Sequence, residues 1–126
     1  MDSGQYLRGI ALFDRADFFE CHEVLEDVWR DAPEAEKKFL QAIIQVAVAF
    51  HHYSQGNSRG ARSLLERALR NLAGYPEEFG GIELTALRKS IAAWQEALAK
   101  EPSKEGLTTP PLPRLKSGIA GKVTRD

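Results

Sequence analysis

The sequence lacks several features that would indicate a particular class of function. Cys21 is the one cysteine among its 126 residues, which excludes an intramolecular disulfide and a paired-thiol metal or redox motif. The net charge of −1 gives no global attraction for nucleic acid or for an anionic membrane. The most apolar run, from Phe39 to Phe50, is too short to span a bilayer, and the N-terminus lacks a signal-peptide pattern. These absences predict a cytoplasmic protein without a membrane association.

The composition that remains is that of an ordinary globular protein. Hydrophobic residues make up 43% of the chain and charged residues 28%, and the length suits one domain. Four of the six prolines follow Glu101. We therefore expect a helical domain over residues 1–100 and a proline-rich tail over residues 101–126. The tail should pack in extended form up to about Leu115 and be mobile from Lys116 to Asp126.

Helical periodicity dominates residues 1–100. It predicts a helix over residues 3–14, a second after the capping-box pair Asp17 and Glu20, and a third over residues 34–55. Two amphipathic helices follow, one starting at Asn57 or Ser58 and the last carrying Leu84 to Leu98. The third segment is apolar almost all round, which is typical of a helix surrounded by others. We expect an all-α fold: a compact bundle of about five helices around a central apolar helix, with no β-sheet.

The segment His22-Glu23-Val24-Leu25-Glu26 is the most distinctive polar motif. Residues four apart share a helix face, so His22 and Glu26 can approach one metal ion, for which Zn or Mn is suitable. Glu23 would occupy the general-base position of the H-E-x-x-H zinc hydrolases, although here a glutamate replaces the second histidine. His52 is a candidate third ligand, because it shares a stripe of the central helix with two glutamines. If that stripe faces His22, the fold assembles a buried polar cluster, whose candidate members are Glu20, His22, Glu23, Glu26, Gln41, Gln45 and His52.

A structural interpretation competes with the metal site. Buried histidine, glutamate and glutamine side chains more often satisfy one another through hydrogen bonds than bind a metal. Glu20 and Asp27 lie away from the apolar arc and should be solvated, whereas Cys21 lies on the arc, where a thiol is normally inert.

The charges are unevenly distributed along the chain. Residues 14–36 are rich in acids, and the fourth helix carries Arg59, Arg62, Arg67 and Arg70. Pairing of these two surfaces between copies would produce a homodimer, with Trp29 or Phe19 at the interface. The same arginines are a weaker indication of phosphate binding, since no aromatic residues alternate with them.

The pattern around the histidine motif resembles the bacterial and archaeal family called domain of unknown function 309. The residues that carry this resemblance are Phe13, Asp14, Phe18, Phe19, Glu20, His22, Glu23, Leu25, Glu26 and Trp29, then the segment 39–47, His52, Gly56, Asn57, Gly60 and Ala61. The similarity covers roughly residues 7–98, with a faint continuation over 111–115. Asp14, Ala16 and Ala42 depart from the family pattern, in which Asn, Gly and Gly stand at these positions.

The resemblance implies a compact all-helical protein. It also implies the family label of a predicted metal-dependent hydrolase, for which no reaction is established. Three hypotheses follow: a structural or partner-binding oligomeric module, a metal-dependent hydrolase, and, least favoured, a nucleic-acid accessory protein.

Overall fold

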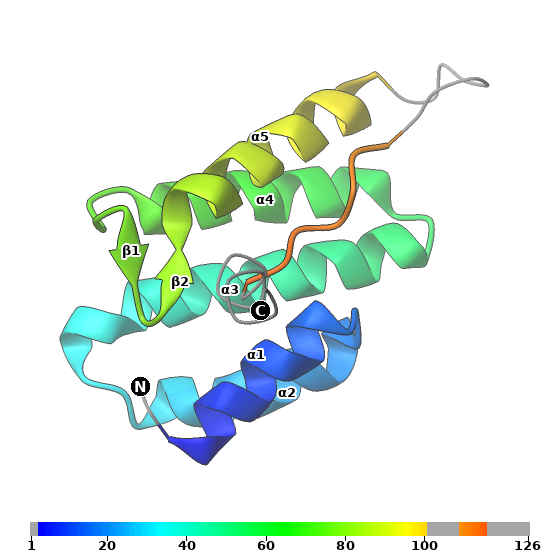
Figure 1. The fold of residues 1–126 in the computed structure, drawn as a ribbon. Helices are drawn as coiled ribbons and strands as arrows, with labels where there is room; N and C mark the ends of the chain where they lie inside the picture. Colours follow the sequence, from blue (N-terminus) through cyan, green and yellow to red (C-terminus); the bar gives the residue numbers. More distant parts are fainter. Residues whose placement is uncertain (1–2, 101–108, 116–126) are drawn as a thin grey trace, which may run out of the picture.

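The computed structural model describes residues 3–100 and 109–115, and helices dominate it. Its elements are α1 (Gly4–Asp14), α2 (Phe18–Arg30), α3 (Glu34–Ser54), α4 (Ser58–Leu72), β1 (Glu78–Phe79), β2 (Ile82–Glu83) and α5 (Leu84–Ala99). The helix α3 lies in the middle, with the α1–α2 pair on one side and the α4–α5 pair on the other (Figure 1). The predicted all-α bundle of five helices is confirmed.

Local sequence signals account for most helix ends. The Ser3 hydroxyl caps α1 by accepting from the amide of Tyr6, and Asn57 caps α4 by accepting from the amide of Gly60. Gly56 has a φ of +83°, the left-handed conformation that ends many helices. The start of α2 at Asp17 is as predicted, but the capping box is wrong. The Asp17 carboxylate makes no cap hydrogen bond and instead pairs with Arg15.

The turn between α1 and α2 places a non-glycine residue in a strained conformation. Ala16 has a φ of +66°, where a Cβ atom crowds the backbone. The amide of Asp17 donates to the carbonyl of Leu12, and that of Ala16 to the carbonyl of Phe13, so the turn closes tightly. This geometry explains physically why glycine suits the position and why alanine carries a conformational cost here.

The core gathers on the inward side of α3. Phe39, Leu40, Ile43, Val46 and Ala47 are fully buried there. The expectation that other helices surround α3 is wrong for one side: a stripe of positions remains exposed or half-buried. The stripe consists of Lys38, Gln41, Gln45, Val48, His52 and Gln55. The spacing of three to four residues keeps these positions on one line along the helix.

A short hairpin precedes α5, although no β-structure was expected. Phe79 pairs with Ile82, and the two-residue turn between them has Gly80 at φ +62° and Gly81 at φ +78°. The Tyr6 hydroxyl donates a 2.6 Å hydrogen bond to the Gly80 carbonyl. A Cβ atom added at Gly80 would lie 2.8 Å from that hydroxyl oxygen, so glycine permits this close approach.

Residues 109–115 form an extended strap that crosses the bundle on the side of α3 where the core lies (Figure 1). Pro113 and Leu115 are buried, and the indole Nε1 of Trp94 donates to the carbonyl of Pro111 over 3.0 Å. The prediction that the tail packs in extended form up to Leu115 is confirmed for this segment. The expectation for residues 116–126 lies outside the described residues, and the division at residue 100 stays a prediction. In the described part of the chain, the helices are too short or too polar to cross a membrane.

Candidate functional site

The histidine motif lies on the side of α2 that borders α3. His22 is about a quarter exposed, and its Nε2 lies 3.4 Å from Oε2 of Glu26, whose side chain is 49% exposed. The other ring nitrogen, Nδ1, lies 3.3 Å from the carbonyl oxygen of Phe19. Glu23 is exposed. The helical spacing of four thus pairs His22 with Glu26 as predicted, at the protein surface.

The polar stripe of α3 contacts α4 rather than α2. Oε1 of the half-buried Gln45 accepts a 2.9 Å hydrogen bond from Nδ2 of Asn71. Nδ1 of His52 lies 3.3 Å from Nδ2 of Asn57, at the start of α4. Gln41 is exposed. The two α3 side chains are therefore fixed by asparagines of α4.

Aromatic contacts join the other edge of the stripe to α2. The exposed ring of Phe19 lies between two imidazoles, with its centroid 5.6 Å from that of His22 and 5.3 Å from that of His51. Further along, Nζ of Lys37 lies 4.2 Å from the ring centroid of Trp29, a cation–π contact. The stripe of α3 thus lies between α2 and α4, the two neighbouring helices that we call its walls.

We call this surface the outer face. It consists of His22, Glu26 and Trp29 of α2, Lys38, Gln41, Gln45, Val48 and His52 of α3, and Leu64, Arg67 and Asn71 of α4. Leu64 and Arg67 belong to it because they lie seven and four residues before Asn71, on the same side of α4. It carries most of the polar residues that the sequence singled out.

Two parts of the predicted site are not assembled within the chain. Among the described residues no polar or charged side chain is buried, so the predicted buried cluster is wrong: Gln41 and Glu23 are exposed. Over the same residues, no three His, Cys, Asp or Glu side chains gather as a metal-binding group, so His52 does not join His22 and Glu26. The physical reason is that the stripe of α3 faces outward between its neighbours instead of into the core.

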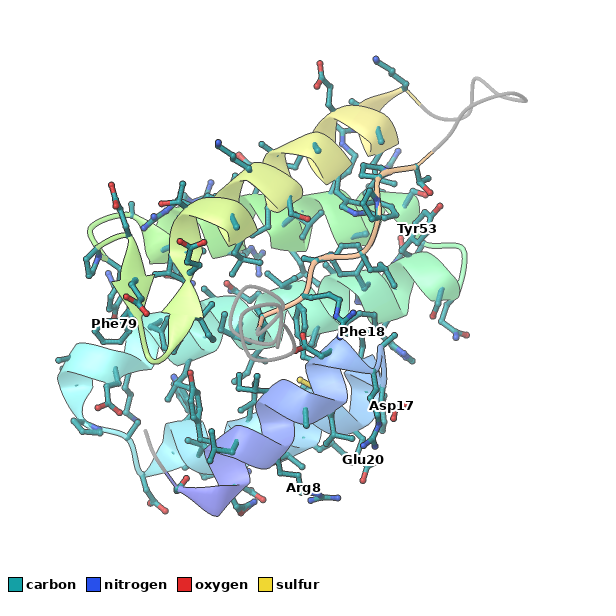
Figure 2. All side chains as sticks on the ribbon, viewed as in Figure 1. Arg8, Asp17, Phe18, Glu20, Tyr53 and Phe79 are labelled. Carbon is teal, nitrogen blue, oxygen red and sulfur yellow. The ribbon has the colours of Figure 1, made fainter. Side chains whose placement is uncertain are left out.

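Several charged residues outside the outer face form exposed ion pairs. Glu20, with 54% of its side chain exposed, pairs with Arg8 of α1 at 2.9 Å (Figure 2). Asp27 pairs with Arg30 on the surface of α2, and Arg70 pairs with Glu66 on α4. The prediction that Glu20 and Asp27 are solvated is confirmed, and such exposed pairs contribute little to stability.

The single thiol is sequestered in the core. Cys21 is fully buried, and this burial, reinforced by the negative charge of Asp14, raises its pKa to about 12. The thiol therefore keeps its proton at neutral pH, and the prediction of a buried cysteine is confirmed.

A pocket lies beside the strap, at the C-terminal end of α3. This pocket has a volume of about 420 Å³. It is lined by Ala16, Phe18, Phe50, His51, Tyr53, Ser54, Trp94, Thr109, Pro110 and Leu112. Figure 2 shows Phe18 and Tyr53 beside the strap. The sequence did not predict this pocket, for which the proline cluster was the available signal.

The fold and the outer face define a small all-helical domain whose distinctive polar residues lie on one surface. The family described as "Domain of unknown function (DUF309)" matches residues 6–64, so the resemblance identified from the sequence is confirmed over this segment. The matched segment runs from α1 into α4 and includes His22, Glu26 and His52.

Two relatives extend the comparison. An uncharacterized protein of Aquifex aeolicus (strain VF5) is 34% identical over 77 residues, which are 60% of this chain and 23% of that protein. The uncharacterized protein YpuF of Bacillus subtilis (strain 168) is 42% identical over 57 residues, 44% of this chain and 33% of YpuF. The matches thus span about a quarter to a third of the length of these relatives.

Proposed function

We propose that this chain is a self-associating helical module, two copies of which meet through the outer face. The observation that carries the proposal is the uncovered stripe along α3. Val48 of this stripe and Leu64 of α4 are half-buried apolar residues of the outer face, whose other members include amide and imidazole groups. A central helix usually buries every side, and a second copy would cover the side that this chain leaves open.

The charges on the two walls of the outer face are complementary. On α2, Glu26 of the outer face is accompanied by the exposed Glu23, and on α4, Arg67 of the outer face is accompanied by the exposed Arg59. Among the described residues, Glu23 and these two arginines take part in no salt bridge. A two-fold axis parallel to α3 would set the acidic wall of each copy against the basic wall of the other. Such complementarity favours association and fixes its orientation.

The direct test is the mass of the protein in solution. We expect a dimer by sedimentation velocity at micromolar concentration, and a monomer after Val48→Asp, because a charge at the centre of the interface would be buried without a partner. The matched control is Ala93→Asp, on the exposed surface of α5. A wild-type monomer at every concentration would end the proposal, as would a Val48→Asp variant that remains a dimer.

A charge exchange tests the orientation. One variant carries Arg59→Glu with Arg67→Glu, so that both walls are acidic, and a second carries Glu23→Lys with Glu26→Lys, so that both are basic. Each variant alone should be a monomer, and an equimolar mixture should form a heterodimer that added salt weakens. Failure of the mixture to associate, with both variants folded, would rule out this two-fold arrangement.

The second candidate function is the metal-dependent hydrolase, which the 3.4 Å approach of His22 to Glu26 favours. In this hypothesis His22 and Glu26 are ligands, Glu23 is the general base and His52 is the third ligand. The described residues do not bring His52 into that group, so one chain does not provide a complete ligand set. We therefore derive no catalytic step. Phosphate binding by the α4 arginines is a weaker alternative, since α4 offers no aromatic side chain for stacking.

A further inference from the structure

The strap and the helices beneath it form a recognisable kind of binding groove. Residues 109–115 contain three prolines, and a proline has no backbone N–H to donate. Such a segment therefore presents mainly carbonyl acceptors and apolar rings to a partner surface. A groove that binds it needs aromatic side chains and a few well-placed donors.

The bundle supplies both. The Trp94 ring packs edge-to-face on Phe50 and on Tyr53, with centroid separations of 5.0 and 5.2 Å, and Phe50 in turn lies 5.4 Å from Phe18. Trp94 is only 2% exposed, and its single polar atom, Nε1, donates to the strap at Pro111. These four rings and this indole donor are what we call the aromatic groove.

The strap is buried at its C-terminal end and leaves a pocket open beside the aromatic groove. At its C-terminal end Pro113 and Leu115 are buried, and the Leu115 amide donates to Asp14. Leu112, in the middle of the strap, is 42% exposed, and the 420 Å³ pocket is lined by Thr109, Pro110 and Leu112 of the strap together with side chains of the bundle, Phe18 and Tyr53 among them. The groove is therefore wider than the segment that lies in it.

We propose that the aromatic groove is a binding site for extended, proline-containing segments of a partner protein, and that residues 109–115 occupy it within the chain. The contacts of the strap indicate what a partner segment needs. It needs a backbone carbonyl that accepts from the Trp94 indole, as Pro111 does, and an apolar side chain four residues later, in the position of Leu115. Recognition of polyproline II segments by aromatic-lined grooves uses the same physics. The groove borders Phe50, nearly half a turn around α3 from His52. It approaches the α2 side of the outer face at His51, which lines the pocket and lies 5.3 Å from the ring of Phe19.

The strap competes with a partner because it is tethered. A short tether gives an effective concentration on the order of millimolar, so a free peptide binds the wild-type chain weakly. Weakening the strap should expose the groove. The test is a titration of the full chain carrying Leu115→Asp with a synthetic peptide of residues 109–115, followed through the indole ¹H–¹⁵N signal of Trp94.

We expect the Leu115→Asp chain to bind the peptide at least about tenfold more tightly than the wild-type chain. A peptide with Asp in place of its final Leu is the matched control and should not bind. Adding Trp94→Phe to Leu115→Asp keeps an aromatic ring at this position and removes the indole donor. Binding to this variant, which lacks the indole signal, is measured by calorimetry beside the Leu115→Asp chain, and should be roughly 2- to 10-fold weaker, the value of one hydrogen bond. If Leu115→Asp does not fold, the milder Leu115→Ala chain replaces it.

Two results would overturn the proposal. The first is an unchanged Trp94 signal when millimolar peptide is added to the folded Leu115→Asp chain. The second is equal affinity of the peptide for the wild-type chain and for the Leu115→Asp chain. Exchange of straps between copies is a distinct source of the same segment. To detect it, a Val48→Asp chain is mixed with a chain that carries both Val48→Asp and Leu115→Asp, since Val48→Asp prevents association through the outer face. A heterodimer in this mixture would show that the partner of the groove is a second copy of this chain and not a separate protein.

Discussion

The backbone amide of Leu115 donates a 2.6 Å hydrogen bond to Oδ1 of Asp14, which fastens the strap to the end of α1. We expect Asp14→Ala to lower the free energy of unfolding by about 1.5–3 kcal/mol, because the acceptor is a carboxylate. Asp14→Asn keeps an oxygen acceptor and should cost less than about 1 kcal/mol. Urea denaturation measures both. Equal losses in the two variants would mean that this hydrogen bond does not hold the strap.

The exposed surface nearby offers a control for that prediction. Asp17→Ala removes a carboxylate whose only described salt bridge is the exposed contact with Arg15. Its effect should be within about 0.5 kcal/mol.

The left-handed conformation of Ala16 predicts an unusual stabilising substitution. At φ +66° the Cβ atom of alanine costs free energy that glycine does not incur, so Ala16→Gly should raise the free energy of unfolding by up to about 1 kcal/mol. The matched change Ala11→Gly, at an exposed position inside α1, should lower it by about 1 kcal/mol. Thermal melts of the two variants should therefore shift in opposite directions. A loss of stability in both would contradict the described turn.

Cys21 predicts a loss of stability at high pH. In the folded chain its pKa is raised from the usual 9.0 to about 12, first by burial and then by Asp14. Between these values the unfolded chain binds fewer protons than the folded chain, so the stabilisation that is complete below pH 9 is lost as the pH rises toward 12. From about pH 8 to pH 10, wild type should lose about 1.4 kcal/mol more than Cys21→Ala in urea denaturation. Identical pH dependence in the two proteins would show that the thiol is accessible.

Elemental analysis separates the two candidate functions. We expect untagged protein to contain no stoichiometric Zn or Mn, and its melting temperature to be unchanged by EDTA. A bound metal would add stability at neutral pH that is lost as His22 becomes protonated, because a ligand must be deprotonated. Stoichiometric metal that disappears in a folded His22→Ala variant would favour the hydrolase. The control is Gln55→Ala, an exposed side chain on the same stripe of α3.

Much of the fold could be predicted from local patterns. The period of apolar residues located five helices, and Gly56 and Asn57 marked the junction between α3 and α4, because these signals act within a few residues. The hairpin was missed because strands of two residues are too short to show an alternation, although the Gly80-Gly81 pair was a turn signal.

The candidate site was harder to predict because it depends on how helices are placed. The sequence correctly put Gln41, Gln45 and His52 on one stripe, since that follows from helix geometry alone. Which side of α3 remains uncovered depends on long-range packing by two helical pairs. The stripe therefore lies at the surface, with Asn57 and Asn71 as the hydrogen-bond partners of its polar groups.

The contact between Tyr6 and Gly80 sets an order of events during synthesis. The Tyr6 hydroxyl belongs to the first helix, and the carbonyl that accepts its hydrogen bond lies 74 residues later. At about 5–20 residues per second, a ribosome makes Gly80 roughly 4–15 s after Tyr6. Until then the growing chain holds α1 without the hairpin that packs on it.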